Sequence, residues 1–488
     1  MIKERERRME CLTSKDYENL EAKNVIQYFA EISKIPRRSG EEKKIREYLE
    51  NFAKERNLKY EKDAYENIIM YKPATKGREN EETLAFQAHT DMICEKDIGV
   101  QHDFSKDPIV LYKEDDNITA KGTTLGADNG IGVAYMLAIL DSDISTPNLE
   151  CIFTVQEETT MIGAIKIDEK NIKARKIISL DNGKEGKILI SSANCNEWIG
   201  RLEANKETIK TKEIYKLQYA NFLGGHSGGN IGDERRGNPI KLAMKVLKEV
   251  DNIQIVKLQG GSRVNVIPRE FEVEFCIGNS SKEQQEVAFN QMLEAIQRQK
   301  GRFHNETIIL EKLTVDKTIQ AYSIKTSRRL IDFVNQYKNG ALKREKSGDV
   351  ILSSNLAVLK EYDKGIQIEF SERSNQKALE KQYLKEITKW IQTYQINIIW
   401  HQELKGVEKK ENNALLEKCQ KVYKKLYNKN MEEVISQGVV EGGFFVDKMP
   451  DCEYVCIGPN CYNVHSPRES VSISSIENVW KFLKEVVK

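Results

Sequence analysis

A histidine and an aspartate, two residues apart, follow a short apolar run and could hold a metal ion. The run, 84–88, is followed directly by His89, and Asp91 comes two positions later. Alternate side chains of a β-strand point to the same side, so we expect these two to lie together. A metal-binding histidine usually donates its second N–H to an acceptor such as a carboxylate, and carboxylates also bind divalent ions. By itself, however, the pair is more typical of a hydrogen-bonded histidine at a strand end.

Four more carboxylates occupy comparable positions in the chain. Each follows the end of a predicted strand or begins the next helix: Asp128, Glu157, Glu158 and Asp181. In open α/β sheets, ligands bind at this edge. Asp128 alone would be interpreted as a helix cap, and the two glutamates as a helix start. Together with Asp91, however, five carboxylates at one edge would repel each other strongly unless cations lay between them, which favours a metal site.

The segments that would position these residues alternate between strands and helices. Apolar positions recur at helical spacing through 22–57 and again after the glycine-rich stretch 122–130. Short strands are predicted at 67–71, 84–88, 151–155 and 176–180. This alternation predicts an α/β fold in which a mostly parallel sheet is covered by helices on both faces.

A second histidine in a similar setting lies near the end of the chain. His465 follows the strand-like run 453–457. If it joins the same site, the residues between must leave the sheet and return to it, as an inserted domain does. We therefore expect a catalytic domain formed by 1–195 and 405–488, interrupted by a lid domain at 196–404.

The expected lid has an α+β pattern. Apolar and polar residues alternate in 271–275 and 366–370, as they do in half-exposed strands, and 239–250 and 327–338 have helical spacing. Strands of this kind are typical of an antiparallel sheet with one covered face.

Composition excludes several other classes of protein. The 488 residues exceed a typical domain about threefold, and 76 basic against 75 acidic residues give a net charge of +1. The chain has no long block of basic residues of the kind that indicates a nucleic-acid partner. The first twelve residues are charged where a signal peptide is apolar, and no apolar run is long enough for a membrane span, so we expect a cytoplasmic protein. Nine cysteines without a CxxC pair indicate reduced thiols.

Seven segments, in order along nearly the whole chain, resemble one family. They are AHTDM, GTTLGADNGIGVA, TVQEE, SLD, GGHSGG, GGSRVNVIPRE and GPNCYNVHSP. They are similar to the motifs of the aminoacyl-histidine dipeptidases (Xaa-His dipeptidases, carnosinase-like), which are cytosolic co-catalytic metallopeptidases. The resemblance implies metal-dependent hydrolysis of unblocked dipeptides of the Xaa-His type by a metal-activated water.

The resemblance also implies how the metal ligands are shared. Two divalent ions would be bound, zinc in the first place and cobalt or manganese as alternatives. His89 and Asp181 would belong to one ion, Glu158 and His465 to the other, and Asp128 would bridge them.

Two neighbouring residues would have catalytic roles. Glu157 would be the general base, and Asp91 would orient the ligand histidine. The chemistry agrees with this division, because adjacent side chains point in different directions and one glutamate can ligate while the other moves a proton.

Further roles are implied for residues of the lid and the last segment. His226 and Asn265 would stabilise the oxyanion, Arg373 would pair with the free carboxylate of a dipeptide, and Glu441 matches another substrate-site position. Without the resemblance, His226 would be a surface-loop histidine and Arg373 a solvated arginine. In dimeric relatives the lids pair through their sheets and supply the histidine to the neighbouring chain, which implies a possible homodimer.

Some positions depart from the family pattern, and two other functions stay open. Thr160 stands where a glycine is usual, Gln437 replaces a histidine, and no acidic run follows Asp181. These changes leave the preference for histidine open. The alternatives are a deacylase of N-acyl amino acids and a catalytically silent peptide-binding protein. Intact Glu157 and Asp91 argue against silence, because a binding protein needs neither a base nor an orienting residue.

Overall fold

The computed structural model describes residues 9–278, 280–303 and 305–488, apart from the side chains of 316 and 317. The chain forms two compact units. Unit 1 contains the described part of Met1–Ile190 with Lys409–Val434 and Glu441–Lys488, and unit 2 contains Ser191–Glu408 and Ile435–Val440. The insert expected at 196–404 lies within the longer segment of unit 2. Most of the charged start of the chain, which the expectation of a cytoplasmic protein used, lies outside the described residues.

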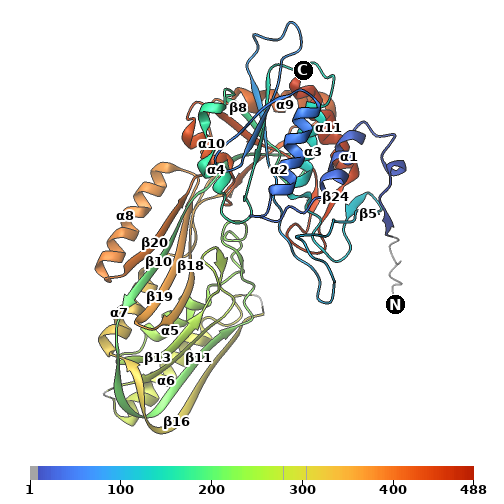
Figure 1. Cartoon of the computed structure of the whole chain (residues 1–488). Coiled ribbons are helices and arrows are strands. Elements are labelled where there is room, and N and C mark those ends of the chain that lie inside the picture. Colours follow the sequence, from blue (N-terminus) through green and yellow to red (C-terminus); the bar gives the residue numbers. More distant parts are fainter. Residues whose placement is uncertain (1–8, 279, 304) are drawn as a thin grey trace. The chain divides into compact units, whose positions relative to one another are not determined.

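A sheet of eight strands forms the centre of unit 1 (Figure 1). In spatial order the strands are β2 (Lys59–Lys62), β3 (Ile68–Lys72), β7 (Leu149–Thr154), β4 (Leu84–His89), β8 (Lys176–Ser179), β22 (Glu453–Cys456), β9 (Lys187–Ser192) and β21 (Glu432–Ser436). The four middle strands, β7, β4, β8 and β22, are parallel. On the flanks, β2 pairs with β3, β3 with β7 and β9 with β22 in antiparallel orientation. The sheet is therefore mixed: its centre is parallel, as expected, and its flanks are antiparallel.

Helices cover both faces of this sheet, as expected (Figure 1). One face packs into a single apolar core with α1 (Lys23–Ile32), α2 (Lys43–Glu55), α3 (Ala127–Leu140), α9 (Ala414–Tyr427) and α11 (Ile473–Val487). The short helices α4 (Ile162–Lys166) and α10 (Gly442–Lys448) lie on the other side. Because both faces are covered, every residue of β4 and β7 is buried.

Helix α3 begins within the glycine-rich stretch 122–130 and holds the end of that stretch in a buried position. It is apolar on all sides, and almost all of its residues are buried between α1 and the central strands. A helix that is apolar all round needs such cover. The N-terminus of α3, which carries Asp128, is therefore fixed by packing along the whole helix.

A smaller sheet of five strands ties the last part of the chain to unit 1. Its order is β1 (Glu10–Cys11), β5 (Tyr112–Glu114), β6 (Asn117–Thr119), β24 (Ser470–Ser472) and β23 (Cys461–Tyr462). The loop that carries His465 connects β23 and β24, so its two ends are anchored by strand pairing. Two short 3₁₀ helices, Ser14–Asp16 and Glu169–Asn171, complete the unit.

Unit 2 is built on a sheet of nine strands, antiparallel in its pairings (Figure 1). Its order is β16 (Thr307–Tyr322), β11 (Lys206–Ala220), β15 (Phe271–Ile277), β13 (Ile253–Gly260), β18 (Val350–Tyr362), β19 (Gly365–Ser374), β10 (Asn194–Glu203) and β20 (Asn397–Leu404), and β17 (Gly340–Arg344) also pairs with β18. Four helices pack with the strands into one core: α5 (Pro239–Lys248), α6 (Lys282–Gln297), α7 (Ile324–Gln336) and α8 (Lys377–Thr393). A separate pair joins β12 (Gly225–His226) to β14 (Val266–Ile267).

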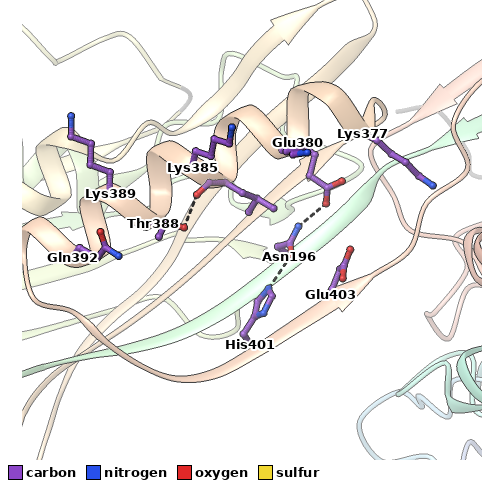
Figure 2. A pocket seen from close by; sticks show the side chains of 11 residues that line it. Asn196, Lys377, Glu380, Lys385, Thr388, Lys389, Gln392, His401 and Glu403 are labelled. Carbon is purple, nitrogen blue, oxygen red and sulfur yellow. Dashed lines mark hydrogen bonds between the residues drawn. The ribbon is translucent and has the colours of Figure 1, made fainter.

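Helix α8 and the strands beside it enclose a groove of about 550 Å³ (Figure 2). Lys377, Lys381, Lys385 and Lys389 line its helical side, and Asn196, His401 and Glu403 line its strand side. None of the site residues predicted from the sequence lines this groove. It is therefore distinct from the candidate active site.

A membrane span is not found in the described residues. No helix there combines the length and the apolar composition that crossing a bilayer requires.

Candidate metal centre

The four parallel strands bring residues from distant parts of the chain to one edge of the unit 1 sheet. His89 is the last residue of β4, Glu158 follows β7, and Asp181 follows β8. His89 pairs in register with Thr154 of β7, so these strand ends lie side by side. β22, the next strand of the sheet, leads on to β23, and His465 lies in the loop between β23 and β24. The edge at which ligands bind in α/β sheets thus carries the residues that the sequence predicted there.

The distances group these side chains around Asp128. His89 Nε2 lies 3.2 Å from Asp128 Oδ1 and 3.7 Å from Asp181 Oδ1. His465 Nε2 lies 3.4 Å from Asp128 Oδ2 and 3.0 Å from Glu158 Oε1. One oxygen of Asp128 therefore faces each histidine, and each histidine has a second carboxylate beside it.

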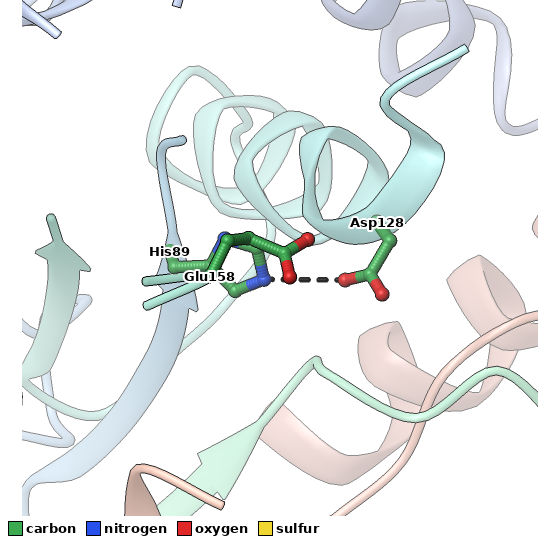
Figure 3. Close-up of side chains that lie close together, drawn as sticks. All are labelled: His89, Asp128 and Glu158. Carbon is green, nitrogen blue, oxygen red and sulfur yellow. Dashed lines mark hydrogen bonds and ion pairs between the residues drawn. The ribbon is translucent and has the colours of Figure 1, made fainter. Parts of the chain in front are cut away.

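Three of these residues already have the spacing of a metal site. One donor atom from each of His89, Asp128 and Glu158 lies within 4.8 Å of the others (Figure 3). The donors are nitrogen and oxygen, without thiolate, which suits zinc and other first-row divalent ions. A cavity of about 80 Å³, lined in part by Asp128 and Asp181, lies beside them.

Asp91 lies beside His89, as expected, but it reaches the histidine from a turn and not along the strand. Strand β4 ends at His89, so the strand alternation predicted for the two residues is wrong. Asp91 is completely buried in the turn that follows, with Oδ1 3.3 Å from His89 Nδ1. Its two oxygens also accept the backbone N–H groups of Glu157 and Glu158, each at 3.1 Å. One carboxylate therefore orients the histidine ring and the turn that carries both glutamates.

The electrostatics of the centre reflect crowded negative charge. Burial, reinforced by the charge of Asp128, raises the pKa of Asp181 to about 7. Hydrogen bonds to Asp128 and Glu158 raise the pKa of His465 to about 11. Burial alone would lower the pKa of His89, yet the carboxylates around it raise that pKa well above its ordinary value. The group holds protons that a divalent cation could replace, and its residues fit a metal ion.

The half-buried Glu157 and the buried Glu441 are two carboxylates whose charges act on each other. Burial raises the pKa of Glu157 well above its ordinary value, and the charge of Glu441 adds to this. Glu441 Oε2 accepts hydrogen bonds from Gln87 Nε2 and Thr154 Oγ1, each at 2.6 Å, while its Oε1 has no partner among the described residues. Burial raises the pKa of Glu441 to about 8. Sequence reasoning missed Gln87 and Thr154, whose only signal is their place near the ends of β4 and β7.

Within unit 2, His226 and Asn265 are neighbours. The backbone N–H of Ser227 donates to the carbonyl of Asn265 at 2.9 Å, next to the pairing of β12 with β14. His226 Nδ1 accepts the backbone N–H groups of Gly228 and Gly229 at 3.2 and 3.1 Å. An imidazole that accepts at Nδ1 carries its proton on Nε2 when neutral. The glycine-rich loop thus makes the exposed His226 an Nε2–H donor.

Arg373 is a buried cation on β19. Its side chain is 4% exposed, Nη1 donates to the carbonyl of Gln437 at 3.1 Å, and Nε has no partner among the described residues. The side chain of Gln437 accepts from Ser353 Oγ at 2.6 Å and donates to the carbonyl of Val350 and to Asn375 Oδ1. The glutamine that departs from the family pattern therefore belongs to a hydrogen-bonded network that supports Arg373.

Thr160, the other substituted position, is exposed. Its backbone N–H donates to the carbonyl of Gln156, and its Oγ1 accepts the backbone N–H of Ile162. The threonine closes the turn between β7 and α4 without touching the histidine–carboxylate group.

Comparison with known proteins identifies the family. Residues 85–488 match the peptidase family M20/M25/M40. The chain is 30% identical over 469 residues to the cytosol non-specific dipeptidase of Escherichia coli (strain K12), covering 94% of this chain and 96% of that protein. The crystal structure of aminoacylhistidine dipeptidase from Vibrio alginolyticus matches with a TM-score of 0.86 at 27% identity, covering 97% of this chain and 99% of that chain. A tripeptidase from Staphylococcus aureus shares the fold, with a TM-score of 0.55 at 15% identity, covering 96% of this chain and 98% of that chain.

These matches confirm the resemblance that the seven motifs indicated, and they confirm the α/β fold class. The histidines and carboxylates of the centre all lie within the matched residues. The chain belongs to the M20/M25/M40 peptidase family and is a metal-dependent peptidase.

Proposed function

We propose that this protein is a cytoplasmic dipeptidase that uses two divalent ions, zinc in the first place, to hydrolyse dipeptides with free termini. The observation that carries the proposal is the position of Asp128, whose two oxygens face two different histidine–carboxylate pairs. A carboxylate in this position can bridge two ions. His89 and Asp181 would hold one ion, and Glu158 and His465 the other.

Two bound ions supply a water of lowered pKa and stabilise negative charge on the scissile carbonyl oxygen. Glu157 takes the proton from the attacking water and passes it to the leaving amine. Asp91 supports this step in two ways. It keeps the ring of His89 in one orientation, and it holds the backbone of Glu157 beside the centre.

The residues of unit 2 bind the substrate. His226 presents an Nε2–H, and with Asn265 it donates to the oxyanion. Arg373 has no ion-pair partner within 4.0 Å among the described residues, so its buried charge is available to a substrate carboxylate. Glu441 lies at the buried end of the site, with one oxygen free to accept a substrate N–H.

The activities of the relatives support dipeptides as the substrate class and do not restrict which side chains the dipeptide carries. One is a non-specific dipeptidase and another an aminoacylhistidine dipeptidase. We therefore propose that Xaa-His dipeptides are among the substrates without being the only ones.

The test combines metal analysis with a substrate screen. We expect two ions per chain after loading with zinc, cobalt or manganese, and hydrolysis of free dipeptides including Xaa-His. The corresponding dipeptide amides should have a higher KM, because Arg373 loses its anionic partner. One ion or none would refute the two-metal centre, and cleavage of N-acyl amino acids in place of dipeptides would refute the substrate class.

Glu157→Gln separates the base from the metal ligands, because glutamine keeps the size of the side chain and cannot accept a proton from water. We expect kcat to fall by about 10²–10⁴-fold, the usual contribution of a general base. Metal content, measured by elemental analysis, should stay that of the wild type. A variant with near-normal turnover would place the base elsewhere.

Metal affinity should rise with pH. A carboxylate and a histidine bind metal only after losing their protons, and the pKa values of Asp181 and His465 are raised to about 7 and about 11. Below pH 7 the ion held by His89 and Asp181 must displace a proton from Asp181, and the other ion must displace one from His465 over the whole range. One coupled proton changes affinity about tenfold per pH unit. We expect binding to weaken at least about tenfold between pH 8 and pH 6 in calorimetric titrations. Affinity that does not change over this range would contradict the crowded-carboxylate centre.

We also propose that the chain forms a homodimer through unit 2. The nine-stranded sheet ends at β16 and β20, and edge strands offer unpaired N–H and C=O groups. The four lysines of α8 lie next to β20, and a two-fold interface there would place like charges against each other. Both edges expose apolar side chains, Ile309 and Leu313 on β16 and Ile399 and Trp400 on β20, so the lysines are what distinguish the two edges. The repulsion expected at the lysine-lined side favours the β16 edge.

Subunit mixing tests whether His226 acts across such a dimer. Inactive Glu157→Gln chains and inactive His226→Ala chains are mixed under conditions where subunits exchange. If His226 serves the neighbouring chain, one site of each mixed dimer is complete, and activity returns. Glu157→Gln mixed with Glu158→Ala is the control, because both changes lie in unit 1 and no complete site can form. Exchange without recovered activity would refute action in trans.

A further inference from the structure

We propose that Arg37 and Glu469, which lie outside the expected ligand set, act together as positioning residues for the metal centre. Both are charged side chains with only 2% of their surface exposed. Each is bonded to the backbone of a turn that carries a centre residue. The inference rests on the proposed metal binding and concerns how the ligands are kept in place.

Glu469 binds the turn before α3 through three backbone N–H groups. Its Oε2 accepts from Leu125 and Gly126 at 2.8 and 2.9 Å, and its Oε1 accepts from the N–H of Asp128 at 3.2 Å. A carboxylate with this many backbone donors fixes the path of the main chain on both sides of Ala127. The orientation of the Asp128 side chain follows from that path.

Arg37 binds the same turn from the carbonyl side and also reaches the turn after β4. Its Nη2 donates to the carbonyl of Gly126 at 2.6 Å, and its Nη1 donates to the carbonyls of Thr90 and Asp91, each at 3.3 Å. The planar guanidinium can reach several acceptors at once, which an ammonium group on a flexible chain does less well. One side chain thus links the turn of Asp91 to the turn of Asp128.

Gly126 is the residue at which the two charges meet. Glu469 accepts its N–H and Arg37 donates to its C=O, although no direct ion pair joins the two charged groups within 4.0 Å among the described residues. Gly126 has φ 72°, and a Cβ there would lie 2.5 Å from Arg37 Nη2 and 2.7 Å from Met92 Sδ. Only glycine lets the main chain pass this close to the guanidinium.

Two buried charges of opposite sign are costly to desolvate, so a role beyond packing is needed to explain them. They hold backbone groups beside Asp91 and Asp128, and these two residues contact both histidines and the backbone of Glu157 and Glu158. Groups that orient metal ligands typically contribute 10–100-fold to metal affinity. We therefore infer that Arg37 and Glu469 maintain the spacing of the ligands when the ions are absent.

The chain offers a matched control in Glu150. It is another glutamate of unit 1 with 2% exposure, and it accepts the backbone N–H groups of Lys173 and Ala174 at 3.0–3.1 Å. It lies near the start of β7, whereas Glu157 and Glu158 follow the end of that strand. Glu150→Gln thus perturbs an equivalent buried carboxylate away from the centre.

The experiment compares Glu469→Gln and Glu150→Gln in the full-length enzyme. Glutamine offers one acceptor oxygen to three N–H groups and turns an NH₂ group toward at least one of them. Calorimetric titration of metal-free protein with zinc should show affinity reduced about 10–100-fold for Glu469→Gln and unchanged for Glu150→Gln. The metal concentration for half-maximal activity should shift by the same factor, with the KM for the dipeptide unchanged at saturating metal.

Substitutions of Arg37 provide a second, independent test of the proposal. Arg37→Met removes both the charge and the planar guanidinium, whereas Arg37→Lys keeps the charge. Metal affinity should therefore be highest for the wild type, lower for Arg37→Lys and lowest for Arg37→Met. Circular dichroism verifies that each variant is folded. If Arg37→Met does not fold, the comparison of Arg37→Lys and Glu469→Gln with the wild type still tests the positioning role. If Glu469→Gln and Arg37→Lys bind zinc as tightly as Glu150→Gln does, the positioning role is refuted. If the wild type binds no zinc, the proposed function itself fails.

Discussion

Repulsion among buried and partly buried carboxylates is the constraint on which the rest of this structure depends. Asp91, Asp128, Glu157, Glu158 and Asp181 occupy one edge of a sheet, with Glu441 close by. Such a group is stable only if protons, histidines or cations compensate its charge. The raised pKa of Asp181 and the ion pairs of both histidines are consistent with such compensation. Two divalent ions would replace these protons and leave the carboxylates as ligands.

The architecture of unit 1 serves to hold this unfavourable group together. Four parallel strands end at the same edge, and covered faces keep their ends rigid. Helix α3 is buried along its length, so the turn at its start cannot move away from the other ligands. The backbone bonds of Asp91, Arg37 and Glu469 then fix the turns between these elements. Rigid scaffolding of this kind is what a preorganised catalytic site requires.

Unit 2 contains the neutral and cationic donors that we propose for substrate binding, and its local structure fixes their hydrogen bonding. The loop around His226 selects the tautomer that carries the proton on Nε2, because two backbone N–H groups occupy Nδ1. Arg373 is buried with no carboxylate partner among the described residues, and the carbonyl of Gln437 and the network around it support its guanidinium. The replacement of histidine by Gln437 is thus accommodated by hydrogen bonding to Ser353, Val350 and Asn375.

The sequence by itself determined the family, the alternation of strands and helices in unit 1, and the candidate residues of the centre. Local chemistry carries this information: His89 and Asp181 follow apolar strands, and Asp128 stands in a glycine-rich turn before an apolar helix. Only the tertiary structure decided which oxygen of Asp128 faces which histidine, and that Asp91 reaches His89 from a turn and not from the strand. Gln87, Thr154, Arg37 and Glu469 could not be found in advance, because their roles arise from contacts between segments 50 to more than 350 residues apart. Such contacts depend on how the strands and turns pack in space, and no local pattern of residues encodes them.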